Sequence, residues 1–186
     1  MNTSRTARLT LAAVASAAAL AGAVTTAANA AGTSTWASQE TRPFRATVAT
    51  DLAQVRAATT KYHDVDQAIA DGYIPTDVCT SSPAGAMGHH FVNPGLIGSP
   101  VATSPAVLLY LPGADGLELA GVEYLQWDAD QDASTFGDRP TLFGRGFDGP
   151  MEGHEPGMPM HYDLHVWLWK HNPDGMFAAF NPAASC

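Results

Sequence analysis

Basic residues are scarce in this chain of 186 residues, which has nine lysines and arginines against eighteen aspartates and glutamates. The formal net charge is −9 at pH 7. Proteins that bind nucleic acid neutralise backbone phosphates with lysine and arginine. The shortage of both argues against a nucleic-acid-binding surface, while the negative field favours cations, metal ions included.

Long apolar runs are absent beyond residue 30. Before it, Arg5 and Arg8 precede an apolar stretch over residues 9–24 and an A-x-A pattern that ends at Ala30, which is the organisation of a secretory signal peptide. We therefore expect cleavage after Ala30 and a secreted, extracellular protein. No later stretch has the roughly 20 apolar residues that span a bilayer, so we expect no retained membrane anchor.

Cysteine is limited to Cys79 and Cys186, too few for a scaffold held together by many disulfides. Cysteines in even number in a secreted protein usually pair. We therefore predict a disulfide between Cys79 and Cys186, which would tie the last residue of the chain to a loop before the first histidine pair. The alternative, that both thiols bind metal, is disfavoured because their spacing has no CxxC character.

Several catalytic motifs are also missing. The chain has no GxSxG elbow and no P-loop, and neither cysteine has the context of a nucleophile. Residues 144–149 spell GxGxxG, but Pro150 and a stretch rich in Gly and Pro follow them where a dinucleotide-binding fold needs a helix. We interpret this segment as a turn.

Helical spacing is confined to the N-terminal third of the expected mature chain. After a loose, polar segment over residues 31–42, a single globular domain is expected over residues 43–186, with Pro43 near the start of its first helix. A second short helix is expected over residues 64–70, ended by Gly72. Beyond it, short apolar pieces alternate with Gly- and Pro-rich turns, which favours strands. The predicted fold class is α+β, with the helical segment packed on a mainly antiparallel β-sheet.

Histidine and methionine concentrate near the C-terminus. Residues 149–181 hold four of the seven histidines, four of the six methionines and two of the four tryptophans, and imidazole, carboxylate and thioether are metal-ligand groups. Read as a strand, residues 161–171 alternate between two faces. The odd positions are His161, Asp163, His165, Trp167, Trp169 and His171, and the other face carries Tyr162, Leu164, Val166 and Leu168, which suit the core.

His161 and His165 form an HxxxH pair, but the predicted strand keeps them apart. Four residues of strand separate their Cα atoms by about 13 Å, too far for both to bind one ion easily. Either the segment is bent or helical near His161, or only one of the two is a ligand. Asp163 could act with either of them, as a ligand or as the carboxylate that orients one.

Two further positions could complete a site. His89 and His90 are adjacent, so a strand would send them to opposite faces, and we favour His90 because the other face then belongs to the core. Glu123 lies in an apolar strand, where a buried carboxylate needs a partner. That partner is a metal ion, a histidinium, or an arginine such as Arg139 or Arg145.

These observations predict a secreted metal-binding protein with a His/carboxylate site for a divalent ion, zinc or copper. The predicted ligands are His90, Glu123, His161 and His165, with His89, His154 and Asp163 as secondary candidates. Methionines near His154 are typical of soft loops that hold copper outside the cytoplasm, although methionine as a filler of core gaps is the alternative.

Two other classes of function stay open. The first is a metal-dependent extracellular enzyme, in which a metal-activated water attacks a substrate and Glu152 or Glu155 is the general base. The second is a binding module without metal, in which the aromatic face of Trp167 and Trp169 grips a sugar or another protein and the histidines are structural. The partner is then a metal ion or a small-molecule ligand, and the sequence does not fix the oligomeric state.

Most of the mature chain resembles a family of small secreted bacterial proteins of uncharacterised function. The blocks that carry the resemblance are KYHDVDQAIADGYIP, GAMGHHFVNPGLIG, LELAGVEYL and GHEPGMPMHYDLHVWLWKHNPDGMFAAFNP. The resemblance implies secretion and a single domain, and supplies no activity. A fainter likeness is to cupins, because Pro156, Gly157 and His161 approximate the PxG and His elements of a second cupin motif, while the HxH and Glu of the first are missing. This likeness implies a small β-barrel as the alternative fold.

Overall fold

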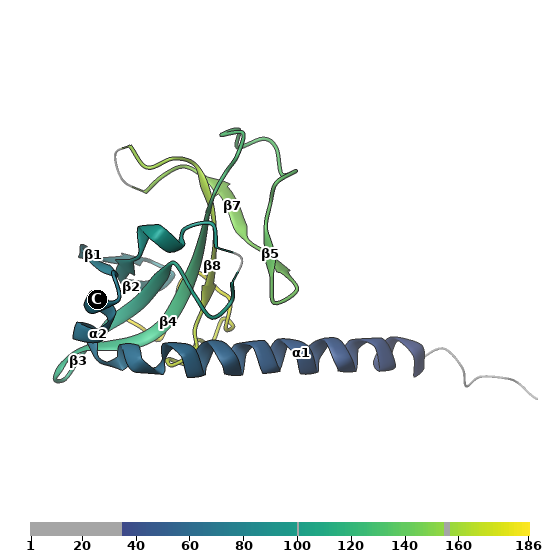
Figure 1. The fold of residues 1–186 in the computed structure, drawn as a ribbon, viewed down its shortest axis with the longest axis horizontal. Helices are drawn as coiled ribbons and strands as arrows, with labels where there is room; N and C mark the ends of the chain where they lie inside the picture. Colours follow the sequence, from purple (N-terminus) through teal and green to yellow (C-terminus); the bar gives the residue numbers. More distant parts are fainter. Residues whose placement is uncertain (1–34, 100, 155–156) are drawn as a thin grey trace, which may run out of the picture.

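Two helices and a short 3-10 turn precede the sheet in the computed structural model, which describes residues 35–99, 101–154 and 157–186. The elements are α1 (Thr35–Thr59), η1 (Thr60–His63) and α2 (Val65–Ala70). Both predicted helices are confirmed. However, α1 begins at Thr35, so residues 35–42, which we expected to be loose, are helical, and Pro43 lies inside the helix and not near its start (Figure 1). The reason is local, because TWASQETR contains good helix formers and no Gly or Pro that would stop the helix.

Helix α2 begins with a defined N-cap. The carboxylate of Asp64 accepts a hydrogen bond from the backbone N–H of Asp66 at the start of α2, which satisfies one of the donors that a helix N-terminus leaves free. After α2, Gly72 has a φ of 94°, a left-handed conformation that glycine adopts without strain. No helix in the described part of the chain is both long and apolar enough to cross a membrane.

The sheet has six strands, and every neighbouring pair is antiparallel. Its order is β1-β2-β3-β4-β8-β7. The bounds are β1 Ile74–Ser82, β2 Gly85–Val92, β3 Val107–Gly113, β4 Gly116–Trp127, β7 Asp148–Met151 and β8 His161–Val166. The short strands β5 (Thr141–Leu142) and β6 (Arg145–Gly146) form a separate hairpin, and a 3-10 turn, η2 (Pro94–Leu96), follows β2.

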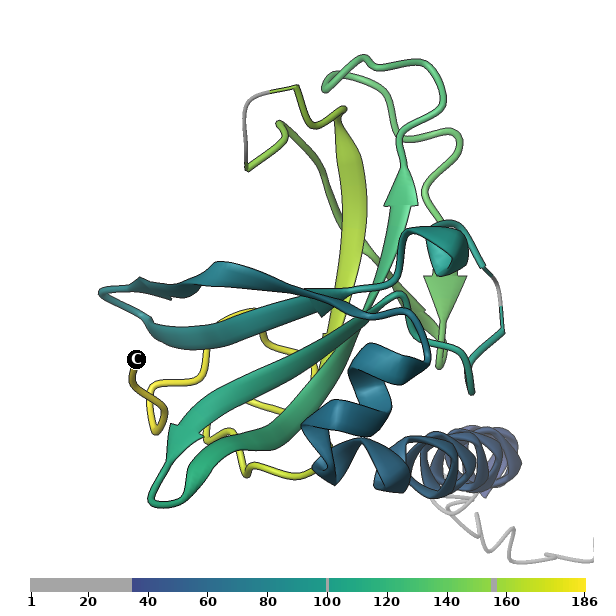
Figure 2. The ribbon, with the colours of Figure 1, turned by 60° about the vertical axis from the view of Figure 1, so that its left-hand side comes forward.

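The sheet curls strongly but does not close (Figure 2). Strands β1 and β7 are its two edges and do not pair with each other. The α+β class is therefore the observed one, and the closed barrel that the cupin likeness implied is not formed by the described strands.

The two faces of the sheet carry different side chains. One face packs against α1 and α2 in the main hydrophobic core, to which β8 contributes Tyr162, Leu164 and Val166. Because side chains alternate along a strand, His161, Asp163 and His165 lie on the other face, hereafter the concave face. The predicted alternation is confirmed over β8, but the strand ends at Val166 and does not continue to residue 171.

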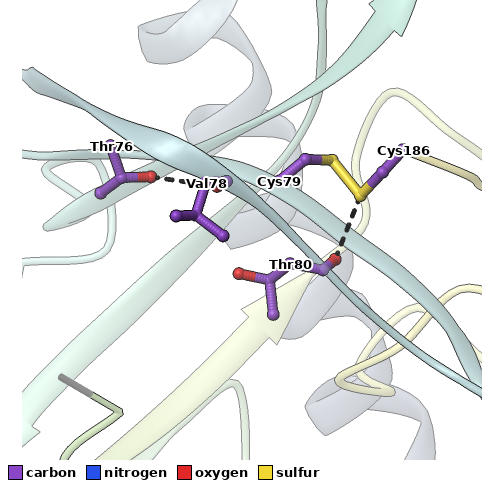
Figure 3. The surroundings of a disulfide bond; sticks show 5 residues. All are labelled: Thr76, Val78, Cys79, Thr80 and Cys186. Atoms are coloured by element: carbon purple, nitrogen blue, oxygen red, sulfur yellow. Dashed lines mark hydrogen bonds between the residues drawn. A yellow bond between two sulfur atoms is a disulfide. The ribbon is translucent and has the colours of Figure 1, made fainter.

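The predicted disulfide is present between Cys79 of β1 and Cys186, whose Cα atoms are 5.7 Å apart (Figure 3). A bridge between Ala86 and Asn181 also pairs the C-terminal segment with β2. At this contact a Cβ on Gly85 would lie 2.2 Å from the carbonyl oxygen of Asn181, so only glycine fits. The C-terminus is therefore held against the β1–β2 hairpin by covalent and backbone contacts.

Candidate metal centre

Three strands bring His90, Glu123 and His165 together on the concave face. Glu123 of β4 pairs directly with His165 of β8. His90 lies on β2, and β3 separates β2 from β4. Two strand spacings place β2 roughly 9–10 Å from β4. The side chains of His90 and Glu123 nevertheless meet over β3, because both are long and the sheet curls. One ligand atom from each of the three residues lies within 4.8 Å of the others.

Small and apolar side chains from the intervening strand form the floor under this group. Val107 of β3 pairs with Glu123, and Leu109 of β3 pairs with His90. Both are fully buried in a cluster with Leu125. Nothing polar on β3 therefore competes for the imidazoles and the carboxylate above it.

The carboxylate of Glu123 lies between the two imidazoles. Its Oε2 is 3.3 Å from Nε2 of His90 and 3.7 Å from Nε2 of His165. The side chains of Glu123 and His165 are 5% and 1% exposed, whereas that of His90 is 18% exposed. The group is thus closed on the sheet side and reachable from solvent at His90.

Several polar atoms in this group and beside it are buried without a hydrogen bond. They are Oε2 of Glu123, both ring nitrogens of His165 and Oδ1 of Asp163. Leaving one buried polar atom unpaired costs about 1–3 kcal/mol, so a cluster of them calls for an explanation. A cation coordinated by the carboxylate and imidazole groups would satisfy the atoms that face the centre of the group.

The charges of Glu123 and His165 depend on each other. Burial disfavours the ionised carboxylate, but His165 and His90 outweigh this effect and lower the pKa of Glu123 to about 2. Burial likewise disfavours a charged imidazole, but the carboxylates of Glu123 and Asp163 raise the pKa of His165 to about 9. Without metal, the pair is an ion pair at neutral pH, and an incoming cation would replace the proton of His165.

Asp163 lies behind His165 and not in the group itself. Its Oδ1 is 3.5 Å from Nδ1 of His165, on the side of the ring opposite to Glu123. Imidazoles that bind metal through one nitrogen commonly face a carboxylate with the other, which fixes the orientation of the ring. Of the two roles predicted for Asp163, the geometry supports orienting His165 over direct coordination.

The remaining histidine candidates lie outside the group. His161, predicted as a ligand, pairs with Trp127 on β4, and its ring contacts that of His154 with centroids 4.8 Å apart. Burial, with a smaller effect from His154, lowers the pKa of His161. His90 is among the grouped residues and His89 is not, and the strand alternation predicted that at most one of the two would face the site.

The arginine alternative for Glu123 is not observed. Arg139 donates from Nε to the backbone carbonyl of Phe147, and the guanidinium of Arg145 lies over the ring of Phe177. Within the described residues, the charged partners of Glu123 are the two histidines.

The structure describes one of the two predicted general bases. Glu152 follows β7 and is exposed. Glu155 lies outside the described residues. The exposed position of Glu152 therefore gives no support to its predicted catalytic role.

The predicted aromatic face is wrong, because the strand alternation stops at Val166. Trp167 is buried, and its Nε1 donates to the carbonyl of Ala178. Trp169 packs against the core on the helix side, with the guanidinium of Arg56 over its ring and His63 at its edge. The two indoles therefore do not form a shared platform beside His165.

The apolar floor is the feature that the sequence analysis missed. The signal was available in VLLYL of β3, which is apolar at every position. Such a run indicates a strand buried on both faces, and it identifies β3 as the centre of the sheet.

Comparisons with known proteins find no match: no protein-family model, no curated protein and no solved structure matches this chain.

Proposed function

We propose that the protein binds one divalent metal ion through His90, Glu123 and His165, and that it does so outside the cell. The observation that carries the proposal is the buried contact between Oε2 of Glu123 and Nε2 of His165, which are 3.7 Å apart and make no hydrogen bond. A buried ion pair normally gains from good hydrogen-bond geometry, and this one lacks it. Two nitrogens and one oxygen facing a common point are instead the donors of a metal site.

The donor set favours zinc as the ion. Zinc binds imidazole and carboxylate at about 2.0–2.1 Å, and tetrahedral geometry then separates neighbouring donors by roughly 3.3 Å. The observed separations of 3.3 and 3.7 Å are close to this value. Copper(II) accepts the same donors and binds such sites more tightly in general, so it is the competing ion.

Secretion rests on two features of the chain. The first is the signal-like N-terminus up to Ala30, which lies outside the described residues. The second is the disulfide between Cys79 and Cys186, because disulfides persist in oxidising compartments and are rare in the cytosol of most organisms. Free zinc and copper outside the cell would then be the ions that this protein meets.

A second candidate function is a metal-dependent hydrolase. It is favoured by the number of ligands, because three protein ligands leave a fourth position for water, as in catalytic zinc sites. His90 is also the most exposed of the three, so the free position would face solvent. A metal lowers the pKa of such a water and makes it a nucleophile at neutral pH.

Thermal unfolding with and without zinc tests the proposed function. Zinc should raise the melting temperature of the wild-type protein, and a chelator should reverse the effect. The Glu123→Gln variant should lose the zinc effect, whereas His171→Ala should keep it, because His171 is exposed and is not one of the three grouped residues. Equal zinc effects in all three proteins, or none in the wild type, would contradict the proposal.

A further inference from the structure

A second group of metal-ligand side chains surrounds His161, which the His90–Glu123–His165 group does not use. His161 begins β8 and pairs with Met151 of β7 on one side and Trp127 of β4 on the other. Paired residues of antiparallel strands project to the same face with Cβ atoms about 4.5–5.5 Å apart. The side chain of Met151 is therefore expected on the same face of the sheet as the His161 imidazole. Both strands meet here at the end of the sheet away from α1 (Figure 1).

The His161 ring is held with one nitrogen available. Its Nδ1 lies 3.4 Å from the carbonyl oxygen of Pro159. A carbonyl oxygen can only accept, so in the tautomer that makes this contact Nδ1 carries the ring proton and Nε2 keeps a free lone pair. Nε2 is buried without a hydrogen-bond partner, in a residue that is 0% exposed. A fully buried imidazole nitrogen with a free lone pair can coordinate a metal ion.

His154 reaches the same place from the loop after β7. Its ring is edge-on to that of His161, with centroids 4.8 Å apart and an interplanar angle of 79°. At this separation, one nitrogen of each ring can approach a common ion bound at about 2.0–2.1 Å. His154 is exposed, so the ion would enter from solvent on its side.

We propose that His154, His161 and Met151 form a second metal site, and that it takes copper(I). Two imidazoles and a thioether form a soft, uncharged donor set, and thioether ligands select copper(I) over zinc, calcium or magnesium. The site is distinct from the first, because four residues of extended strand place His161 about 13 Å from His165. The protein would thus hold a divalent ion in its interior and a soft monovalent ion at its solvent-facing end.

The test is an anaerobic titration of the zinc-loaded mature protein with copper(I), in competition with a chromophoric copper(I) chelator. The wild type should take up about one copper(I) per chain without releasing zinc, and X-ray absorption should show sulfur as well as nitrogen around the copper. His154→Ala should weaken copper(I) binding by about tenfold or more. Met151→Leu should weaken it and remove the sulfur signal, whereas Met176→Leu should change neither, because Met176 lies beside α1 on the other side of the sheet.

His154 is the most informative position because it is exposed, and its substitution does not disturb the core. Copper(I) uptake that is unchanged in His154→Ala would overturn the second site, as would no uptake in the wild type. Zinc released in proportion to the added copper would also overturn it, because copper would then occupy the first site. A His90→Ala variant separates the two proposals: it should lose zinc and keep copper(I).

Discussion

Glu123 and His165 are directly opposite each other on β4 and β8, with Oε2 and Nε2 3.7 Å apart. The residues next to each of them along the strand point to the opposite face of the sheet and lie in the main hydrophobic core, among them Val122, Tyr124 and Leu164. A slip of one residue in the pairing would turn this apolar set away from the core. The hydrophobic pattern that fixes the register therefore also fixes the position of the candidate ligands.

The substitution Glu123→Gln removes the charge that holds His165 protonated. We expect the metal-free protein to lose roughly 3 kcal/mol of its free energy of unfolding, because breaking a buried pair leaves its partner uncompensated. NMR titration should show a fall in the pKa of His165. Glu118→Gln is the matched control, since Glu118 is an exposed residue of the same strand and should change stability by less than about 0.5 kcal/mol. Equal effects of the two substitutions would mean that the pair contributes nothing.

The stability of the metal-free protein should depend on pH through this pair. Burial lowers the pKa of His165, but Glu123 and Asp163 raise it to about 9. A group with a raised pKa stabilises the fold while it is protonated, so this contribution is complete below pH 6.5 and is lost as the pH rises through about 9. The pKa of Glu123, lowered to about 2, gives a contribution that is complete above pH 4.5 and lost on acidification.

Zinc should reverse the alkaline part of this dependence. Because zinc replaces the proton of His165, the extra stability that zinc gives should increase between pH 6.5 and about 9. Urea unfolding at intervals of one pH unit from pH 5 to 9, with zinc and with chelator, measures whether the stability that zinc adds rises with pH. Zinc and chelator curves that stay parallel over this range would show that zinc does not compete with this proton.

Asp163→Asn tests the orienting carboxylate behind His165. We expect zinc affinity to fall by about 10–100-fold, as for other carboxylates that face a metal-binding imidazole, while the fold persists. Nitrogen NMR shifts of the His165 ring should report a changed tautomer in the variant. An unchanged zinc affinity with an unchanged tautomer would show that the 3.5 Å contact has no role in metal binding.

Removing the disulfide should affect stability and leave metal binding intact. The Cys79→Ser/Cys186→Ser variant loses a cross-link that spans 107 residues, and the chain-entropy model assigns about 4–5 kcal/mol to a loop of that length. Zinc affinity should hold, because Glu123 and His165 are positioned by strand pairing on β4 and β8. Urea unfolding and zinc titration on the same samples measure both effects. A large loss of zinc affinity in the folded variant would show that the bridge shapes the site.

The alternation along β8 could be predicted from the sequence, because polar and apolar residues alternate strictly from His161 to Val166. It placed Asp163 and His165 on one face. The same reasoning indicated that His161 and His165 are too far apart to share an ion, and the structure keeps His161 outside the group.

Which strands neighbour one another could not be predicted in this way. His90 meets Glu123 across β3 only because the order is β2-β3-β4-β8 and the sheet curls. Neither feature has a local signature in the residues that flank His90. The end of β8 was also unpredicted, because it depends on the C-terminal segment: the N–H of Trp167 bonds to the carbonyl of Met176, a contact between residues that alternation does not describe.

The metal content of the purified protein is the most decisive test of the His90–Glu123–His165 site. The mature protein, purified without chelator or histidine tag, should be compared by elemental analysis with the neighbouring variants His89→Ala and His90→Ala. We expect about one divalent ion per chain in the wild type and in His89→Ala, and loss of that ion in His90→Ala. Wild-type protein that carries no ion, even after incubation with zinc and copper, would contradict it, as would an ion retained equally by all three proteins.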